Sequence, residues 1–333
     1  MMKRPTNSFD DVLLVPQHSD IKSRTEIDIS RTLGAQTYEI PIISSPMDTV
    51  TGLDMAKTFS TLGGMSVTHR YCSMQEQSRM TPATSAAAIG INGDFMERID
   101  YLNKTSNVNV FCLDVAHGHH VLMERALKSI KDKYGDDFTL IAGNVATPQG
   151  YVSLSEWGAD AVRIGIGGGS ICSTRVQTGH GVPTFESVLT CGYEDGATII
   201  ADGGIKSAGD IVKALAAGAD FVMLGSMLAG TDESPGQVFQ SSDGGKYKVY
   251  RGMASVEAQR DWRGKAKSLE GISTTIPYKG SVVPIVENLI QNIKSGLSYT
   301  GARNITQLQS RAEFILQTHA AQIESSTHIL NKR

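Results

Sequence analysis

The sequence has no long apolar run, no excess of basic residues and no closely spaced pair of cysteines. No stretch reaches the ~18 apolar residues that cross a bilayer, so no membrane partner is expected. The formal net charge of −3 indicates no excess of basic residues for binding phosphate backbones, so we expect neither DNA nor RNA as a partner. The cysteines form no C-x-x-C pair and have no companion histidines at zinc spacing. Because no apolar segment opens the chain, we expect free thiols in a reducing cytoplasm.

Short β-branched or apolar runs alternate with helix-like stretches along the 333 residues. Such alternation predicts right-handed β-α-β units and a parallel sheet. An open doubly wound sheet would compete, but no G-x-G-x-x-G follows an early strand. Eight units close a barrel, so we predict a single (β/α)8 TIM barrel over residues 1–333. The eight candidate strands are Ile40–Ser44, Gly64–Val67, Ala87–Ile91, Val110–Asp114, Thr139–Gly143, Ala161–Gly165, Thr198–Ala201 and Phe221–Leu224.

Amphipathic patterns between these strands predict helices. Examples are Met123–Lys133, Gln149–Trp157 and Ala208–Ala217, the last opened by Ser207 as N-cap and closed by Gly218. From about Leu297 the chain is rich in Gln, Ser and Thr and predicts one or two surface helices with a mobile tail.

Nearly every candidate strand ends in polar or flexible residues. A single Asp or Asn at such an end is also a common turn residue. Seven strand ends of this kind favour the shared carboxyl-end face on which α/β barrels carry their active sites. These ends are Ser44–Asp48, Thr68-His69, Asp114, Asn144, Gly165–Ser170, Asp202–Gly204 and Gly225-Ser226.

The glycine-dense loop Gly165–Arg175 holds one cysteine, Cys172, directly after an apolar run. Successive glycines give up packing, so they indicate a backbone that turns sharply and approaches something small. A thiol at the tip of such a loop is a candidate nucleophile, and the Thr174 hydroxyl is placed to assist it. The alternative is a tight turn that carries an incidental buried cysteine.

A phosphate site is predicted at the ends of the seventh and eighth strands. Gly203 and Gly204 lead into a helix, and Gly225 and Ser226 follow the next strand. Backbone amides aimed at a helix N-terminus suit a phosphate dianion. A carboxylate at Asp202 would then accept hydrogen bonds from a ribose diol, unless it only caps its own helix.

These residues resemble the IMP dehydrogenase and GMP reductase family almost from end to end. The resemblance implies a barrel, usually tetrameric, that binds a purine monophosphate and a nicotinamide cofactor and joins Cys172 covalently to purine C2. It also implies a monovalent cation, typically potassium, on carbonyls near Gly167, Gly169 and Cys172. Gly168 departs from the proline or serine usual in the family. The motifs are Phe9–Pro16, Ser44–Val50, Gly143-Asn144, Gly169–Cys172, Asp202–Lys206, Leu224–Gly230 and Tyr250–Met253.

The segment from His69 to Ser85 is too short for the regulatory domains that most IMP dehydrogenases insert there. Dehydrogenases of the family also use an arginine–tyrosine pair on a long flap, which residues 254–269 lack. Thr178–Gly181 and Ala219–Gly225 resemble the reductase, whereas Ser44–Met47 and Ala201–Lys206 resemble the dehydrogenase. We therefore predict an NADPH-dependent GMP reductase. IMP dehydrogenase is the alternative within the family, and a non-redox phosphosugar- or nucleotide-binding barrel is the alternative outside it.

The resemblance also assigns roles to residues. Cys172 would attack C2, while Glu270, with Thr174 as relay, would handle protons on the purine; without the family context Glu270 would be a solvated loop carboxylate. The histidines His117, His119 and His120 are expected as surface residues with at most a minor cofactor contact. The remaining predicted contacts are Met47, Ser170, Asp202, Gly203, Gly204, Gly225, Ser226, Tyr250, Gly252, Met253 and Gly271 for the nucleotide and Asp114, Asn144 and Gly165 for the cofactor.

Overall fold

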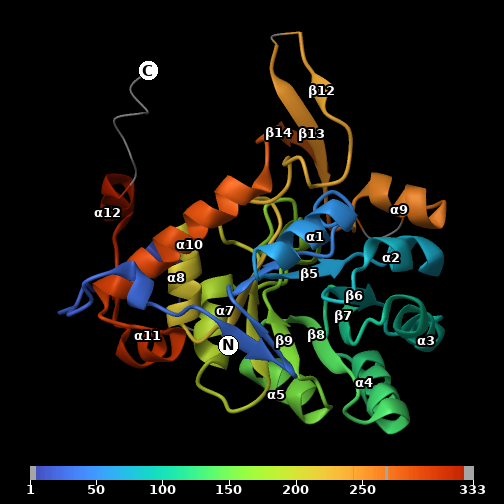
Figure 1. Ribbon diagram of the computed structural model, residues 1–333, viewed down its shortest axis with the longest axis horizontal. Coiled ribbons are helices and arrows are strands. Elements are labelled where there is room, and N and C mark those ends of the chain that lie inside the picture. Colours follow the sequence, from blue (N-terminus) through green and yellow to red (C-terminus); the bar gives the residue numbers. More distant parts are fainter. Residues whose placement is uncertain (1–4, 243, 267–268, 326–333) are drawn as a thin grey trace.

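Eight parallel strands form a closed barrel in the computed structural model, which describes residues 5–242, 244–266 and 269–325 (Figure 1). The strands follow one another around the barrel in chain order, and β11 pairs with β4 to close it. This confirms the predicted TIM barrel, and each predicted strand agrees with an observed one to within two residues at either end. The barrel strands are β4 (Ile42–Ser44), β5 (Met65–Thr68), β6 (Ala86–Ile89), β7 (Val110–Asp114), β8 (Thr139–Val145), β9 (Ala161–Ile164), β10 (Thr198–Asp202) and β11 (Phe221–Leu224).

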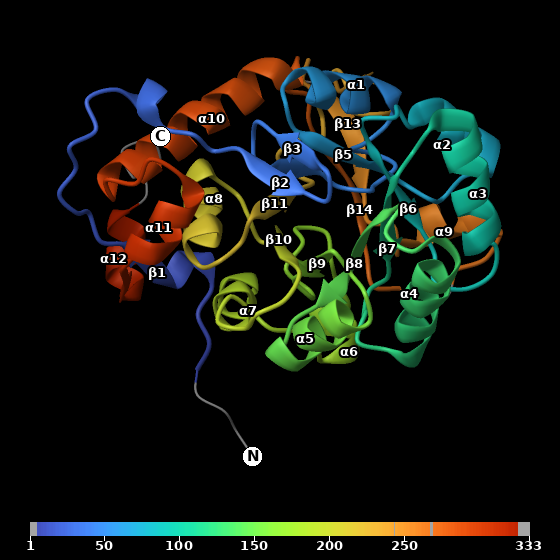
Figure 2. The same cartoon turned by 60° about the horizontal axis from the view of Figure 1, so that its bottom comes forward.

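Helices lie outside the ring of strands, as Figure 2 shows. The three predicted helices are confirmed as α4, α5 and α8. The Ser207 hydroxyl caps α8 by accepting the Asp210 N–H at 3.1 Å. The helices around the barrel are α1 (Leu53–Thr61), α2 (Met74–Met80), α3 (Phe95–Ser106), α4 (Val121–Tyr134), α5 (Pro148–Glu156), α6 (Thr174–Thr178), α7 (Thr184–Cys191), α8 (Ala208–Ala216) and α10 (Val282–Tyr299).

The barrel interior is a packed core that closes its amino end. Inward side chains of the strands form a hydrophobic cluster with Leu33 and Tyr38. These two residues come from the hairpin of β2 (Arg31–Leu33) and β3 (Gln36–Tyr38). Tyr38 packs edge-on against Phe221, the first residue of β11, with ring centroids 5.9 Å apart. In the part of the chain that the structure describes, this hairpin covers the amino end of the barrel.

The two ends of the described chain pair with each other. Strand β1 (Val12–Leu14) runs antiparallel to β15 (Phe314–Leu316) beside the 3-10 turn η1 (Phe9–Asp11). The expected C-terminal helices are α11 (Ile305–Arg311) and α12 (His319–Glu324), but β15 was not predicted. The end of the predicted mobile tail, 326–333, lies outside the described residues.

A small three-stranded sheet projects beyond the carboxyl end of the barrel in Figure 1. It consists of β12 (Phe239–Gln240), β13 (Lys246–Arg251) and β14 (Ser273–Pro277). Helix α9 (Val256–Arg263) lies in the connection from β13 to β14. Among the described helices, none has the length and hydropathy that a membrane span requires. The other short element is the 3-10 turn η2 (Arg24–Glu26).

Candidate active site

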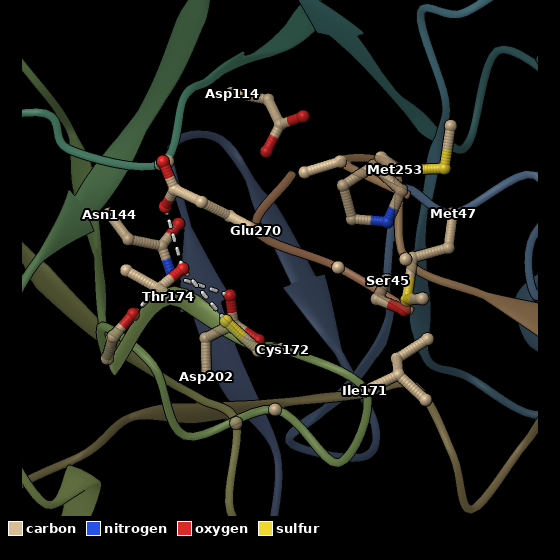
Figure 3. A pocket seen from close by; sticks show the side chains of 18 of the residues that line it. Ser45, Met47, Asp114, Asn144, Ile171, Cys172, Thr174, Asp202, Met253 and Glu270 are labelled. Atoms are coloured by element: carbon tan, nitrogen blue, oxygen red, sulfur yellow. Dashed lines mark hydrogen bonds between the residues drawn. The ribbon is translucent and has the colours of Figure 1, made fainter. Parts of the chain in front are cut away.

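A cavity of about 270 Å³ lies at the carboxyl ends of the barrel strands (Figure 3). The loops after β4, β5, β7, β8, β9 and β10 line it, together with the segments beside β13 and β14. Most of the predicted site residues therefore meet here, although they are far apart in the sequence. Those that line the cavity are Met47, Asp114, Asn144, Gly165, Gly167, Gly169, Cys172, Thr174, Asp202, Gly203, Tyr250, Gly252, Met253, Glu270 and Gly271.

Cys172 is the exposed cysteine of the chain and faces this cavity. Cys112 and Cys191 are buried, and Cys72 is half-buried. Burial raises the pKa of Cys112 to about 11 and the pKa values of Cys72 and Cys191 to about 12, which keeps these three thiols protonated. The alternative of a buried cysteine in a tight turn does not hold for Cys172.

A chain of two hydrogen bonds joins Cys172 to Glu270. The Cys172 thiol donates to Thr174 Oγ1 at 3.1 Å, and the Thr174 hydroxyl donates to Glu270 Oε2 at 2.9 Å. Thr174 is the first residue of α6 and is buried, which fixes its hydroxyl between the other two groups. The arrangement can pass a proton between sulfur and carboxylate.

Main-chain contacts hold the two ends of this chain together. Cys172 and Gly271 form an antiparallel bridge. The Ser173 N–H donates to the Glu270 carbonyl at 2.9 Å, and the Ile272 N–H donates to the Ile171 carbonyl at 3.0 Å. The loop with the thiol and the segment with the carboxylate are thus paired like two short strands.

Asp202 takes part in a polar network in the cavity floor. Its Oδ2 accepts hydrogen bonds from Asn144 Nδ2 at 2.7 Å and from Arg163 Nη2 at 2.8 Å. Ser207, not Asp202, caps the following helix, which removes the capping alternative for this carboxylate. Both Asn144 and Asp202 were predicted site residues, and their side chains lie close together in Figure 3.

Sequence reasoning missed Arg163, which lies inside the run Ala161–Ile164 and was counted with its apolar neighbours. Its side chain is buried, and its guanidinium contacts both Asp114 and Asp202. Burial alone would lower the pKa of Arg163, but the two carboxylates outweigh it and raise that pKa well above the usual value. The signal was a charged residue inside an otherwise apolar strand.

A second cavity, of about 220 Å³, lies on the other side of Gly168, which lines both. Three of the predicted phosphate contacts, Ser170, Gly204 and Ser226, line it. The Ser170 and Tyr250 hydroxyls lie 3.3 Å apart, and burial raises the pKa of Tyr250, so its hydroxyl stays protonated. The predicted phosphate residues therefore span the boundary between the two cavities.

Gly225 lines neither cavity but packs beside residues of the first one. A Cβ there would lie 3.2 Å from the Tyr250 hydroxyl and 3.3 Å from the Met47 sulfur and from the Ser45 hydroxyl. The absence of a side chain at Gly225 lets these groups pack together. Its predicted contribution would come from the main chain.

The comparisons with known proteins identify the family. A family model described as "IMP dehydrogenase / GMP reductase domain" matches residues 6–328. The chain belongs to this family. It is 37% identical to GMP reductase 2 of Homo sapiens over 93% of this chain and 94% of that protein. It is 45% identical to inosine-5'-monophosphate dehydrogenase of Bacillus subtilis over 73% of this chain and 51% of that protein. Both activities therefore occur among its relatives.

The fold is also that of a solved member of the family. The structure of a cysteine-to-alanine variant of GMP reductase from Trypanosoma brucei, in complex with guanosine 5'-monophosphate, superposes with a TM-score of 0.92 and 29% sequence identity. The match covers 98% of this chain and 98% of that chain. In the present chain, the connection from β5 to β6 consists of residues 69–85. It contains helix α2 and no further described helix or strand.

The segment that could distinguish the two activities of the family folds mainly as α9. The Arg251 guanidinium contacts Asp48 and Asp261, both at 2.6 Å, which ties the helix to the barrel. Tyr71 packs edge-on against Trp262 with ring centroids 6.3 Å apart. No tyrosine occurs between Met253 and Glu270, and residues 267–268 of this stretch lie outside the described residues.

The carbonyls expected to hold a monovalent cation belong to one turn of the cysteine loop. The Gly169 carbonyl accepts the Cys172 N–H at 3.1 Å. Arg175 packs against Gly167 and donates to the Val182 carbonyl at 2.8 Å. Among the described residues, no group of three His, Cys, Asp or Glu side chains could hold a metal ion.

The predicted surface histidines lie on the loop that leads into α4. His117 and His120 are exposed. His120 Nδ1 accepts the Leu122 N–H at 3.1 Å and caps the helix, while the His119 ring packs against Trp157. Two of the three thus have structural contacts of their own.

Proposed function

We propose that this family member is an NADPH-dependent GMP reductase, which converts GMP to IMP and ammonia. The observation that carries the proposal is the exposed Cys172 thiol, linked through Thr174 to Glu270, together with the absence of tyrosine from residues 254–269. Removal of an amine requires a proton at the leaving group, which the thiol–hydroxyl–carboxylate chain can deliver. Hydrolysis of the adduct, as in the dehydrogenase, requires an activated water instead.

The first step joins the thiol to the purine. Cys172 sulfur forms a bond to C2 of GMP as its proton passes through Thr174 to Glu270. The same proton then returns along the chain to the exocyclic amine. The C2–N bond breaks, ammonia leaves, and a thioimidate between Cys172 and the purine remains. Atoms and charge balance without any water.

The second step releases the product. NADPH supplies a hydride when bound, and Asp114, Asn144 and Gly165 are the residues that would hold it. The carboxylate, amide and glycine backbone at the cavity floor fit a ribose and a nicotinamide amide. Cys172 would then depart from C2 as a thiolate, because the C2–S bond breaks when the new C2–H bond forms, and would regain its proton from solvent.

The remaining residues would place the nucleotide. Asp202 would accept hydrogen bonds from the ribose, and Met47 and Met253 would present soft apolar surface to the base, with Gly252 and Gly271 beside it. Potassium on the Gly167, Gly169 and Cys172 carbonyls and a homotetramer complete the proposal. The phosphate would meet Ser170, Gly203, Gly204, Gly225, Ser226 and Tyr250.

A paired assay tests the proposal. GMP with NADPH should oxidise the cofactor and release equal amounts of IMP and ammonia. IMP with NAD tests the second candidate, IMP dehydrogenase, which the dehydrogenase-like sequence at Ser44–Met47 favours. Formation of XMP and NADH would replace the proposal by that candidate. No change of cofactor absorbance in either assay would overturn both.

A further inference from the structure

Arg163 lies between two carboxylates that face the same cavity. Its Nη1 donates to Asp114 Oδ1 at 2.6 Å, and its Nη2 donates to Asp202 Oδ2 at 2.8 Å. The two aspartates are the last residues of β7 and β10, while Arg163 comes from β9, which lies between these strands in the barrel. One rigid guanidinium thus sets the orientation of both acceptors.

Each carboxylate lines the cavity and bonds Arg163 through one of its two oxygens. Among the described residues, the hydrogen bonds to the Asp202 side chain come from Asn144 and Arg163, and both end on Oδ2. Asp114 uses Oδ1 for Arg163, and its Oδ2 lies 3.8 Å from Arg70 Nε. Each aspartate can therefore accept a hydrogen bond from a ligand hydroxyl without losing its bond to Arg163.

The guanidinium has little freedom to move. The Arg163 side chain is 7% exposed. Loss of one carboxylate partner would leave a buried charge uncompensated, which strongly destabilises a folded protein. At the base of the side chain, a Cβ on Gly143 would lie 2.6 Å from Arg163 Cβ, so Gly143 packs tightly against this residue. If one carboxylate is ordered by a ligand, the guanidinium and the opposite carboxylate are ordered with it.

We infer that Arg163 is a positioning residue that couples the two halves of the cavity. Binding of the purine nucleotide at Asp202 strengthens binding of the cofactor's ribose at Asp114, and the reverse effect is equal in size because binding linkage is reciprocal. The inference rests on the proposed function for the assignment of the two riboses. Arg163 thus acts through Asp114 and Asp202 and need not contact either ligand itself.

The test uses ligands that cannot react or stack on each other. IMP and the 2′-phosphate of ADP-ribose keep the ribose contacts, but the second lacks the nicotinamide ring, so no hydride is transferred. Calorimetry on the whole wild-type chain should show that saturating IMP tightens binding of the ADP-ribose derivative at least about fivefold. The derivative should tighten IMP by the same factor.

Two arginine variants separate coupling from a general loss of structure. In Arg163→Lys one ammonium cannot span both carboxylates, so the mutual effect should fall below about twofold. Arg70→Lys is the matched control, because Arg70 contacts Asp114 through its Nε and through the Asp114 carbonyl at 3.1 Å and has no contact with Asp202. It should weaken the ADP-ribose derivative alone and leave the coupling in place.

The outcomes are distinct. If IMP does not bind the wild type, the proposed function fails. If both ligands bind but do so independently, or if Arg163→Lys retains the full coupling, the inference on Arg163 is overturned. Should Arg163→Lys not fold, Asp114→Asn gives a second measurement. In that variant the mutual effect of the two ligands should fall below about twofold, because a neutral amide no longer pairs with the Arg163 guanidinium. Full coupling in Asp114→Asn would count against the inference.

Discussion

The Cys172 thiol donates to the Thr174 hydroxyl over 3.1 Å, at the point where the glycine loop becomes helix α6. This contact makes the threonine the only link between sulfur and the Glu270 carboxylate that the described hydrogen bonds provide. The chemistry proposed for the site therefore depends on the Thr174 hydroxyl as well as on the thiol and the carboxylate.

Loss of that hydroxyl should slow the reaction more than it weakens binding. Thr174→Val keeps the size of the side chain but removes the relay, and we expect kcat with GMP to fall roughly a hundredfold or more with little change in KM. Thr174→Ser keeps a hydroxyl and should retain most of the rate. Steady-state kinetics of both variants measure the difference; equal rates for Val and Ser would exclude the relay.

Alkylation should single out Cys172. The other thiols are buried or half-buried, with pKa values that burial raises to about 11 or 12, so iodoacetamide near neutral pH meets one accessible sulfur. Peptide mass spectrometry should find the label on Cys172, and IMP should protect it. Cys172→Ala should remain unlabelled and lack turnover. Label on Cys72 at a comparable rate would contradict the burial described.

The two loop glycines Gly165 and Gly179 should respond differently to alanine. Both have positive φ, +146° and +71°, so each substitution carries backbone strain of about 1–2 kcal/mol. A Cβ at Gly165 would also overlap the Asp202 carbonyl, whereas at Gly179 no described heavy atom lies within 4 Å. We expect Gly165→Ala to lower the melting temperature further and to raise KM for GMP. Equal decreases in melting temperature for the two variants would show that the Asp202 main chain can move aside without loss of stability.

Acid should destabilise the fold through His69. Burial lowers the pKa of His69; Asp48 and Glu76 act in the opposite direction, and Arg251 acts with burial. The folded protein thus resists protonation, and the unfolded chain binds a proton below about pH 6.5. The free energy of unfolding should therefore fall as pH drops below that value. Urea titrations should show a weaker decline in His69→Gln, and parallel curves for both proteins would refute this origin.

Local sequence patterns were sufficient for the barrel and for most of the floor of the site. Eight β-branched or apolar runs, seven of them with polar or flexible ends, predicted the strands, because both the period and the end residues are local features. The partners of those residues were not local. Glu270 lies 96 positions from Thr174, and only the family resemblance connected them.

Two features, Arg163 and strand β15, were not predicted because they depend on contacts between residues far apart in the sequence. Arg163 is charged within a strand that is otherwise apolar, and only the closed barrel brings Asp114 and Asp202 to it. Strand β15 has three residues and owes its conformation to β1, about 300 positions earlier in the chain. Neither contact leaves a periodic trace in the sequence.

The main-chain pairing of residues 171–173 with 270–272 has a mechanical consequence. Because the two segments are paired, the Cys172 sulfur and the Glu270 carboxylate would move together if the cavity opened to admit a nucleotide. In the mechanism proposed above, the thiol, hydroxyl and carboxylate would then stay assembled during substrate entry and product exit.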